Sequence, residues 1–247
     1  MADIRFCDMS PLGKLRVCGA ASHDFIRIMF TADPGAFEGL GGAAAALLLT
    51  GEAEIIDLAV IIRTGDDEYM VTTSAATADE AFAWLQSHSE IADDNGPIFE
   101  GLEITNETDS LADVVLFGEG SWAVLDELAG GSLELFPHNG SLVMAQLGTV
   151  PVLILASPVL PGEVFELFCP PQKLQPLTYA LLSFPEIDPM TAEEYQELRT
   201  SLGTWFTQAE DAAYTFPDEA GLMRLVRPAM DFVGGKALAQ RCDKESA

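Results

Sequence analysis

The apolar residues of the chain follow strand spacing and helix spacing in turn, and the same succession of segments occurs twice. Alternation over short runs predicts strands, and apolar residues three and four positions apart predict helices. The first succession comprises predicted strands at 14–18, 43–49, 54–63 and 68–73 and predicted helices at 21–30 and 77–86. The second comprises predicted strands at 113–117, 141–146, 150–157 and 164–169 and predicted helices at 121–128 and 171–182.

The repeated order of strand, helix, three strands and helix indicates an internal duplication. Gly19 and Gly118 follow the first strand of each copy, and Gly65 and Gly162 lie in the turn before the last strand. Strands joined by short turns, with helices between them, predict an α+β fold in which antiparallel sheets carry packed helices. The sequence has no G-x-G-x-x-G motif and no phosphate-binding loop, and the glycines of 39–42 predict a turn.

We expect residues 1–247 to form a single unit of two interleaved lobes. The lobes correspond to pseudo-repeats at 12–88 and 111–182. The remaining segment, 190–240, is expected to fold back on them as a C-terminal segment.

This C-terminal segment has its own boundary signals. An acidic linker bounded by prolines, 184–189, separates it from the second copy. Thr191 and Glu194 have the spacing of a capping box, which predicts the start of a helix, and Gly203 is expected to end that helix. A further short helix is predicted at 234–241.

The charge of the chain excludes two classes of partner. There are 39 acidic and 12 basic residues, giving a formal net charge of −27, and such a surface repels nucleic acid and anionic membranes. Adaptation to high salt and ordinary solubility charge both explain the acidity, and the apolar fraction of 49% favours the second. Because the basic residues concentrate toward the C-terminal end, that end is expected to contribute to binding any anionic ligand.

Cysteines and histidines are too few and too scattered for a metal site or a disulfide scaffold. The four cysteines include no C-x-x-C pair, and we expect reduced thiols in a cytoplasmic protein. The first ten residues lack the apolar core of a signal peptide, and no apolar run reaches the ~18 residues of a membrane span. His23, His88 and His138 are expected to be isolated surface or cap residues.

Asp57 interrupts an otherwise apolar strand, where Ile55, Ala59 and Ile61 are its expected neighbours on one face. A carboxylate buried there without a partner is costly, so it must border a cleft, cap a backbone group or meet a cation. Buried carboxyls with shifted pKa values gather at functional sites, which makes Asp57 a candidate catalytic residue. A structural hydrogen bond at the edge of the strand is the alternative.

Glu166 and Arg199 are two further charged residues at positions where the pattern favours apolar ones. Glu166 shares a strand face with Val164 and Phe168, and it is either a site residue or part of a solvated face. Arg199 lies four residues after Tyr195, within the apolar stripe of its helix. An inward-facing arginine needs an anionic partner, so Arg199 either binds an anionic ligand or forms an internal ion pair.

Short motifs along most of the chain resemble, in order, those of the glycine-cleavage T-protein superfamily of folate-binding aminomethyl- and methyltransferases. The matching segments are 15–19 (LRVCG), 51–60 (GEAEIIDLAV), 68–71 (EYMV), 165–167 (FEL), 198–203 (LRTSLG), 219–222 (EAGL) and 231–238 (DFVGGKAL). Each motif alone is weak, but together they follow the family order. The family fold contains a doubled α+β arrangement, in agreement with the duplication inferred above.

The resemblance implies roles for five residues. Asp57 falls on the second aspartate of the family's D-D-L strand, which implies a catalytic carboxylate near the reacting nitrogens of folate. Glu166 falls on the glutamate that holds the pterin ring, a task that suits a carboxylate because it accepts two parallel hydrogen bonds. Arg199, in the L-R helix motif, is implied as a contact of the folate carboxylate, and Tyr69 and Trp205 are implied as further cofactor-binding residues.

The resemblance therefore implies a tetrahydrofolate-binding protein that transfers a methyl or aminomethyl-derived one-carbon unit to or from folate. An amine, a carrier protein or a corrinoid protein could supply the unit. Ile56 replaces the first aspartate of the family pair, and the matches stop before the family's C-terminal β-domain, so a short form without that domain is expected. These departures keep open a second hypothesis, a non-catalytic folate-binding or assembly module that has lost the transferase activity.

Overall fold

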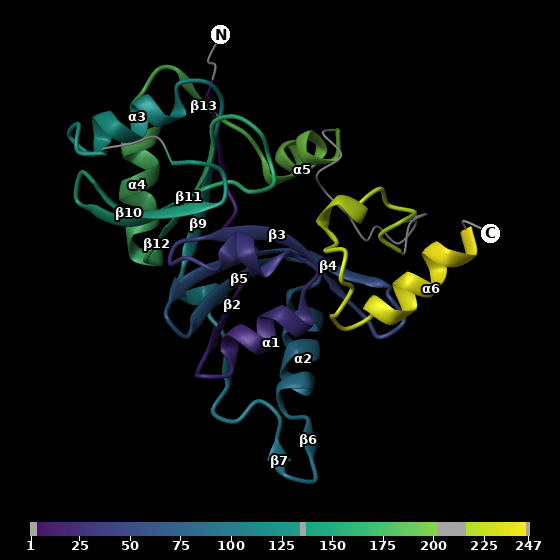
Figure 1. The fold of residues 1–247 in the computed structure, drawn as a ribbon. Coiled ribbons are helices and arrows are strands. Elements are labelled where there is room, and N and C mark those ends of the chain that lie inside the picture. Colours follow the sequence, from purple (N-terminus) through teal and green to yellow (C-terminus); the bar gives the residue numbers. More distant parts are fainter. Residues whose placement is uncertain (1–3, 134–136, 202–215, 246–247) are drawn as a thin grey trace. The chain divides into compact units, whose positions relative to one another are not determined.

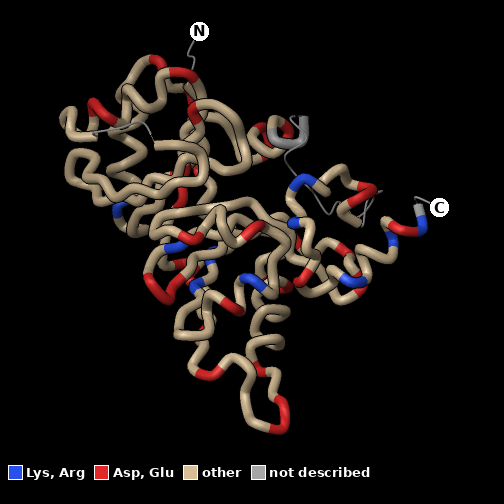
Figure 2. The backbone as a smooth tube through the Cα atoms, in the orientation of Figure 1, with Lys and Arg blue, Asp and Glu red and all other residues tan. Residues whose placement is uncertain are grey.

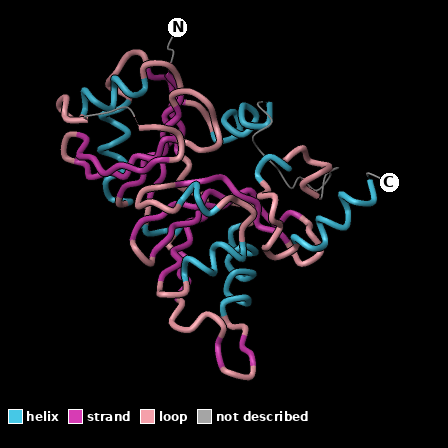
Figure 3. The backbone as a smooth tube through the Cα atoms, viewed as in Figure 1, coloured by secondary structure: helices cyan, strands magenta, loops and turns pink. Residues whose placement is uncertain are grey.

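The computed structural model describes residues 4–133, 137–201 and 216–245, and the chain divides into two compact units. Unit 1 consists of Met1–Leu12 and Glu107–Trp205, and unit 2 consists of Gly13–Asn106 and Phe206–Ala247. Each unit is built from two separate stretches of chain. Each contains one main sheet with helices beside it (Figure 1 and Figure 3).

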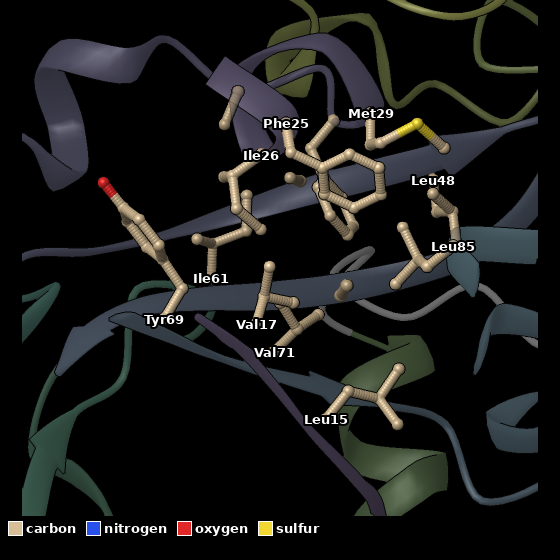
Figure 4. Packing of buried hydrophobic residues seen from close by; sticks show 14 of the residues in the cluster. Leu15, Val17, Phe25, Ile26, Met29, Leu48, Ile61, Tyr69, Val71 and Leu85 are labelled. Atoms are coloured by element: carbon tan, nitrogen blue, oxygen red, sulfur yellow. The ribbon is translucent and has the colours of Figure 1, made fainter. Parts of the chain in front are cut away.

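Unit 2 is built on a five-stranded antiparallel sheet with the order β3-β4-β5-β2-β8. Its strands are β2 (Gly13–Cys18), β3 (Ala43–Leu49), β4 (Ile55–Gly65), β5 (Glu68–Thr73) and β8 (Glu103–Asn106). Helices α1 (Ser22–Met29) and α2 (Ala78–Ser89) cover one face of this sheet. Phe25 and Leu85 of these helices pack with Leu15, Val17 and Ile61 of the sheet, which form part of the unit's main core (Figure 4).

Unit 1 is built on a six-stranded sheet with the order β10-β11-β12-β9-β1-β13. Its strands are β1 (Ile4–Asp8), β9 (Ala112–Phe117), β10 (Ser141–Leu147), β11 (Val150–Ala156), β12 (Val164–Cys169) and β13 (Ile187–Pro189). All neighbours are antiparallel except β1 and β13. Helices α3 (Ser121–Leu128) and α4 (Leu174–Leu181) pack through Leu125 and Leu177 against Phe165 and Leu167 of the sheet.

The predicted α+β fold and its duplication are confirmed. The order β3-β4-β5-β2 in unit 2 corresponds strand for strand to β10-β11-β12-β9 in unit 1. The join between the first strand and the first helix is also repeated, since Gly19 and Gly118 both adopt positive φ, 117° and 131°, a conformation that favours glycine. Their N–H groups donate to the carbonyl oxygens of Asp67 and Glu163, each in the turn before the last strand of its copy.

Short elements that the hydrophobic pattern did not predict complete the fold. They include β1, β8, β13 and the hairpin of β6 (Ala92–Asp93) and β7 (Gly96–Pro97). Within the described residues, short 3₁₀ turns join the longer elements: η1 (Pro34–Phe37), η2 (Thr108–Ser110), η3 (Pro171–Lys173) and η4 (Met223–Leu225). The helix predicted at 171–182 is thus divided into η3 and α4. The grouping of 12–88 and 111–182 as lobes of a single unit stays a prediction.

The predicted capping box forms at the start of α5 (Ala192–Ser201). The Thr191 N–H donates to Glu194 Oε2 at 2.7 Å, and the Glu194 N–H donates to Thr191 Oγ1 at 3.1 Å. The predicted end of this helix at Gly203 lies outside the described residues. The last helix, α6 (Gly235–Glu245), begins one residue after the predicted start.

Hydrogen bonds from a buried arginine join the C-terminal part of unit 2 to the end of α1. Arg227 is 7% exposed. Its Nη1 donates to the carbonyl oxygens of Phe30 at 2.6 Å and Ala32 at 2.9 Å, and its Nη2 donates to that of Arg27 at 2.7 Å. Its Nε donates to Asp231 Oδ1 at 2.6 Å. Because the last carbonyl groups of a helix have no partner within it, Arg227 supplies donors at the place where α1 ends.

The chain that follows α1 covers the outer edge of β3 at its C-terminal end. The Thr31 N–H donates to the Leu47 carbonyl oxygen at 3.2 Å, and Thr31 Oγ1 accepts from the Leu47 N–H at 2.8 Å. The same hydroxyl donates to the Leu225 carbonyl oxygen at 2.9 Å, and Phe30 forms a single antiparallel bridge with Leu48. Backbone groups at this edge therefore have partners within the chain.

The C-terminal segment also packs on the β3–β4 pair from the side opposite the helices. Gly234, at φ 82°, allows a close approach, since a Cβ there would lie 2.4 Å from the carbonyl oxygen of Thr50. Apolar side chains of the segment and of the strand pair form one cluster: Leu222, Phe232 and Leu238 with Leu47, Leu49, Ala53, Ile55 and Leu58.

Replacing Arg227 with methionine should lower the free energy of unfolding by about 3 kcal/mol or more, because buried carbonyl groups and Asp231 lose their charged donor. Methionine keeps an unbranched apolar side chain, so little packing is lost. Urea unfolding measures the change. The matched control is Arg224→Met on the same segment, where the arginine is exposed and the loss should stay below about 1 kcal/mol. Equal losses in the two variants would contradict the role given to Arg227.

Candidate functional site

Asp57 lies on β4, between β3 and β5, and its carboxyl is almost completely buried. The residue is 2% exposed. Its Oδ2 accepts a hydrogen bond from the backbone N–H of Ser74, and its Oδ1 accepts one from the Ser74 hydroxyl, both at 2.7 Å. Ser74 directly follows β5 and precedes α2. From an interior strand, the Asp57 carboxyl therefore caps the backbone N–H of Ser74. Capping a backbone group is one of the roles that the sequence left open.

A shift of register in the β3–β4 pair lies next to Asp57 and separates its face from that of Ile55. Asp57 pairs with Leu48, whereas Leu49 pairs with Ile55, so β4 holds an extra residue at this point. Directly paired residues lie on the same face of a sheet, and side chains alternate along each strand. Asp57 consequently shares the helix-covered face with Ala59. The expectation that Ile55 also shares this face is wrong, because the shift places Ile55 with Leu49 in the cluster on the other side.

Burial is the largest influence on the Asp57 carboxyl, and it raises the pKa above the ordinary value of an aspartate. The hydroxyl and the N–H of Ser74 stabilise the charged form and lower the pKa, but they do not offset the burial. A carboxyl with a raised pKa exchanges its proton closer to neutral pH, which is what a general acid or base requires.

Glu166 lies on β12, between β11 and β9, in a strand whose six residues are all buried. It is 6% exposed and pairs with Leu155 on one side and Val115 on the other. Phe165 and Leu167 belong to the core beneath α3 and α4, so Glu166 points to the opposite face of the sheet. The alternative of a solvated face is wrong for Glu166.

Tyr69 on β5 is a member of the main core of unit 2 (Figure 4). It is 0% exposed, and its ring meets that of Phe37 edge to face, with centroids 6.0 Å apart. Its hydroxyl lies 2.7 Å from Nδ1 of His23 on α1, and burial raises the pKa of the phenol. His23 is therefore not the isolated residue that was expected. A role of Tyr69 in cofactor binding stays a prediction.

Two of the predicted site residues, Arg199 and Trp205, are described only in part or not at all. Arg199 lies within α5, and Trp205 lies outside the described residues. Asp57 belongs to unit 2, whereas Glu166 and Arg199 belong to unit 1. The convergence of Asp57, Glu166 and Arg199 on one cleft stays a prediction.

Ser74 is a site residue that the hydrophobic pattern did not reveal. It supplies both hydrogen bonds to the Asp57 carboxyl, although Asp57 lies 17 residues earlier in the chain. Ser74 lies three residues before the helix predicted at 77–86, outside the capping position, so no local signal marks it. Spacing along the chain does not show that β4 passes next to this position.

The residues that the structure describes form no metal site, and two of the cysteines are unreactive. Within residues 4–133, 137–201 and 216–245, no three His, Cys, Asp or Glu side chains are arranged to hold a metal ion. Burial, together with nearby carboxylates, raises the pKa of Cys7 and of Cys169 to about 11, so both thiols are protonated at neutral pH. None of the helices in those same ranges is long and apolar enough to cross a membrane.

Sequence comparison finds relatives along nearly the whole chain. The model of the family described as the GCVT N-terminal domain matches residues 2–230. The aminomethyltransferase of Thermotoga petrophila is 27% identical over 242 residues, which cover 96% of this chain and 63% of that protein. The aminomethyltransferase of Chlorobaculum parvum is 27% identical over 244 residues, with 94% and 63% covered. The chain thus spans less than two thirds of the length of these relatives.

Comparison of structures gives a corresponding result for the fold. The crystal structure of the glycine cleavage system aminomethyltransferase T from Bartonella henselae matches with a TM-score of 0.82 at 20% identity, covering 98% of this chain and 64% of that one. The heterotetrameric sarcosine oxidase from Corynebacterium sp. U-96 matches with a TM-score of 0.50 at 12% identity, covering 73% and 82%. At these identities the matches show a common fold.

Asp57→Asn should gain stability relative to the wild type as the pH rises from about 4, the ordinary pKa of aspartate, toward neutrality. The folded chain holds the Asp57 proton more tightly than the unfolded chain does, so the wild type loses stability as the pH rises through this window. Asparagine has the same shape and does not titrate. Urea unfolding at several pH values measures the difference. A difference that is constant with pH, or that changes in the opposite direction, would show that the pKa is not raised.

Proposed function

The chain belongs to the GCVT N-terminal domain family, and on this premise we propose that it binds tetrahydrofolate and transfers a methyl or aminomethyl-derived one-carbon unit to or from it. The observation that carries the proposal is the Asp57 carboxyl, 2% exposed and with a raised pKa, at the position that matches the family's aspartate strand. The proposed donor or acceptor of the unit is an amine, a carrier protein or a corrinoid protein.

Asp57 is the proposed proton carrier. In its protonated form the carboxyl gives a proton to a departing amine nitrogen, and in its ionised form it stabilises a cationic amine or takes the proton back. Ser74 fixes the orientation of the carboxyl through both oxygens. A positioned acid or base of this kind contributes about 10²–10⁴-fold to a rate.

Glu166 is the proposed anchor for the pterin ring. Tetrahydrofolate, when bound, supplies the nitrogen atoms that carry the one-carbon unit. A glutamate that is only 6% exposed on an apolar strand suits the ring, because its two oxygens accept two parallel hydrogen bonds from the aminopyrimidine edge. Arg199 is the proposed partner of the folate carboxylate, and Tyr69 and Trp205 complete the proposed set.

A second candidate function is folate binding or assembly without transfer. The geometry of Asp57 favours it, since both carboxyl oxygens accept hydrogen bonds from Ser74 and little of the residue is exposed. A carboxyl in this state also serves as a purely structural cap. The two candidates predict the same binding and differ in transfer.

Calorimetric titration with tetrahydrofolate tests the binding that both candidates share. The wild type should bind, and Arg199→Ala should weaken binding by roughly 10- to 150-fold, the equivalent of about 1.5–3 kcal/mol for a charged hydrogen bond. Glu166→Gln should also weaken binding, because an amide replaces an acceptor by a donor. Arg224→Ala is the control at an exposed arginine and should bind as the wild type does. A wild type that shows no binding would overturn the proposal.

Transfer is tested by incubating the chain with tetrahydrofolate and either N-methylated amines or an aminomethylated carrier protein, and by following the folate product by mass spectrometry. Asp57→Asn should keep its affinity for tetrahydrofolate and lose transfer by about 100-fold or more. Circular dichroism checks that the variant is folded. A wild type that binds tetrahydrofolate but transfers from none of these donors would support the second candidate.

A further inference from the structure

One stretch of this highly charged chain carries no charge at all. From Pro137 to Gly162 the sequence has no Asp, Glu, Lys or Arg, although the chain holds 39 acidic and 12 basic residues. The stretch contains β10 and β11, which form a hairpin in unit 1. In Figure 2 this hairpin is tan, without the red or blue that marks charged residues. The surface that it forms lacks the acidity of the rest of the molecule.

Strand β10 is the first strand of the sheet in unit 1, so only one of its two edges is paired (Figure 1). It pairs with β11 at seven successive positions without a shift of register. Within the described ranges, no strand pairs with its other edge. Natural proteins protect such edges with lysines, prolines, bulges or short strands. Strand β10, whose sequence is SLVMAQL, has none of these features.

The opposite end of the same sheet shows the usual protection. Strand β13 has three residues, of which Asp188 is charged and Pro189 has no backbone N–H to donate. Short length, charge and proline together prevent another chain from adding to that edge. Of the two end strands that the structure describes in this sheet, only β10 lacks these protections.

The exposed face of β10 is uncharged, and its most exposed side chain is apolar. Met144 is 84% exposed, more than any other large apolar residue on the described surface. Val143 and Ala145 pack at the margin of the core beneath α3 and α4, so Leu142, Met144 and Gln146 point to the other face by alternation. A methionine adapts its shape to a partner surface more readily than a branched side chain does.

The duplicated fold supplies an internal comparison. Strand β3 is the counterpart of β10 in unit 2, and the C-terminal end of its outer edge is covered by the chain itself through the Phe30–Leu48 bridge and the two hydrogen bonds between Thr31 and Leu47. In unit 1 the Leu128 carbonyl oxygen at the end of α3 accepts from the Gly148 N–H just beyond β10, but no described segment pairs with the outer edge of Ser141–Leu147 itself. What covers the edge in one copy is an extended piece of backbone, so the same kind of partner fits the other.

We propose that β10 is an association edge, where the chain pairs antiparallel with β10 of a second copy. A strand that pairs antiparallel with its own copy uses the same residues on both sides of a two-fold axis, so no second binding surface is needed. Each copy has a net charge of −27, and two such chains repel one another least where the contact contains no charge. A partner that relies on ion pairs would find no counter-charge along β10.

In this arrangement the two six-stranded sheets become continuous across the axis. Backbone N–H and C=O groups at the edge of β10 gain partners, and Met144 of each copy is covered by the other. Added salt screens the repulsion between the acidic chains, so the pairing should strengthen as salt is raised. The proposal does not depend on folate binding or on transfer.

Sedimentation velocity over a range of protein concentrations, at about 0.15 M salt and above it, tests the proposal. The wild type should be a dimer at high concentration. Met144→Lys and Gln146→Lys each place a charge on the edge strand and should raise the dissociation constant at least tenfold, about 1.4 kcal/mol. Leu40→Lys, at a residue that is 71% exposed in unit 2, is the matched control and should dimerise as the wild type does.

Hydrogen exchange locates the contact. In the wild type, amide protection within Ser141–Leu147 should increase with protein concentration, and in Met144→Lys it should not. A wild type that sediments as a monomer at every concentration would overturn the proposal. So would a dimer that Met144→Lys and Gln146→Lys leave intact, or one that Leu40→Lys weakens equally. Because the three substituted residues are exposed, melting curves should confirm that each variant is folded.

Discussion

The burial of the Arg227 guanidinium is the interaction on which the arrangement of unit 2 depends. It brings the C-terminal segment to the end of α1, where carbonyl groups lack partners within the helix, and Asp231 neutralises its charge. The effect reaches the candidate site through strand pairing. Phe30 accepts from Arg227 and bridges Leu48, and Leu48 pairs with Asp57. The C-terminal segment therefore supports the strand pair that carries the carboxyl.

The two copies of the duplicated fold have kept their strand order but have placed their buried carboxyls differently. Glu166 pairs with Val115 in unit 1, whereas at the corresponding place in unit 2 Met70 pairs with Arg16. Asp57 lies on β4, whose counterpart in unit 1 is β11 and not β12. Each carboxyl thus belongs to one copy alone. The duplication supplies two similar sheets, and the chemistry that we propose comes from residues that differ between them.

Periodicity predicted the longer strands and helices because each buries one face, and the capping box at Thr191 followed from local spacing alone. It did not predict β1, β8 and β13, whose pairing is decided by contacts with strands far away in sequence. The charge on an apolar strand identified Asp57, but neither its partner Ser74 nor the register shift beside it can be found from alternation. Arg227 was also missed, because its partners are carbonyl groups about 200 residues away.

The pKa of the Asp57 carboxyl, measured by carbon-13 NMR on protein labelled at aspartate, tests the proposed role of this residue most directly. Asp57→Asn assigns the resonance. We expect a pKa above the ordinary aspartate value of about 3.9, a further rise in Ser74→Ala because the ionised form loses a hydrogen bond, and a shift of the resonance when tetrahydrofolate is added. A carboxyl that titrates at or below the ordinary value, with no response to tetrahydrofolate, would contradict this role.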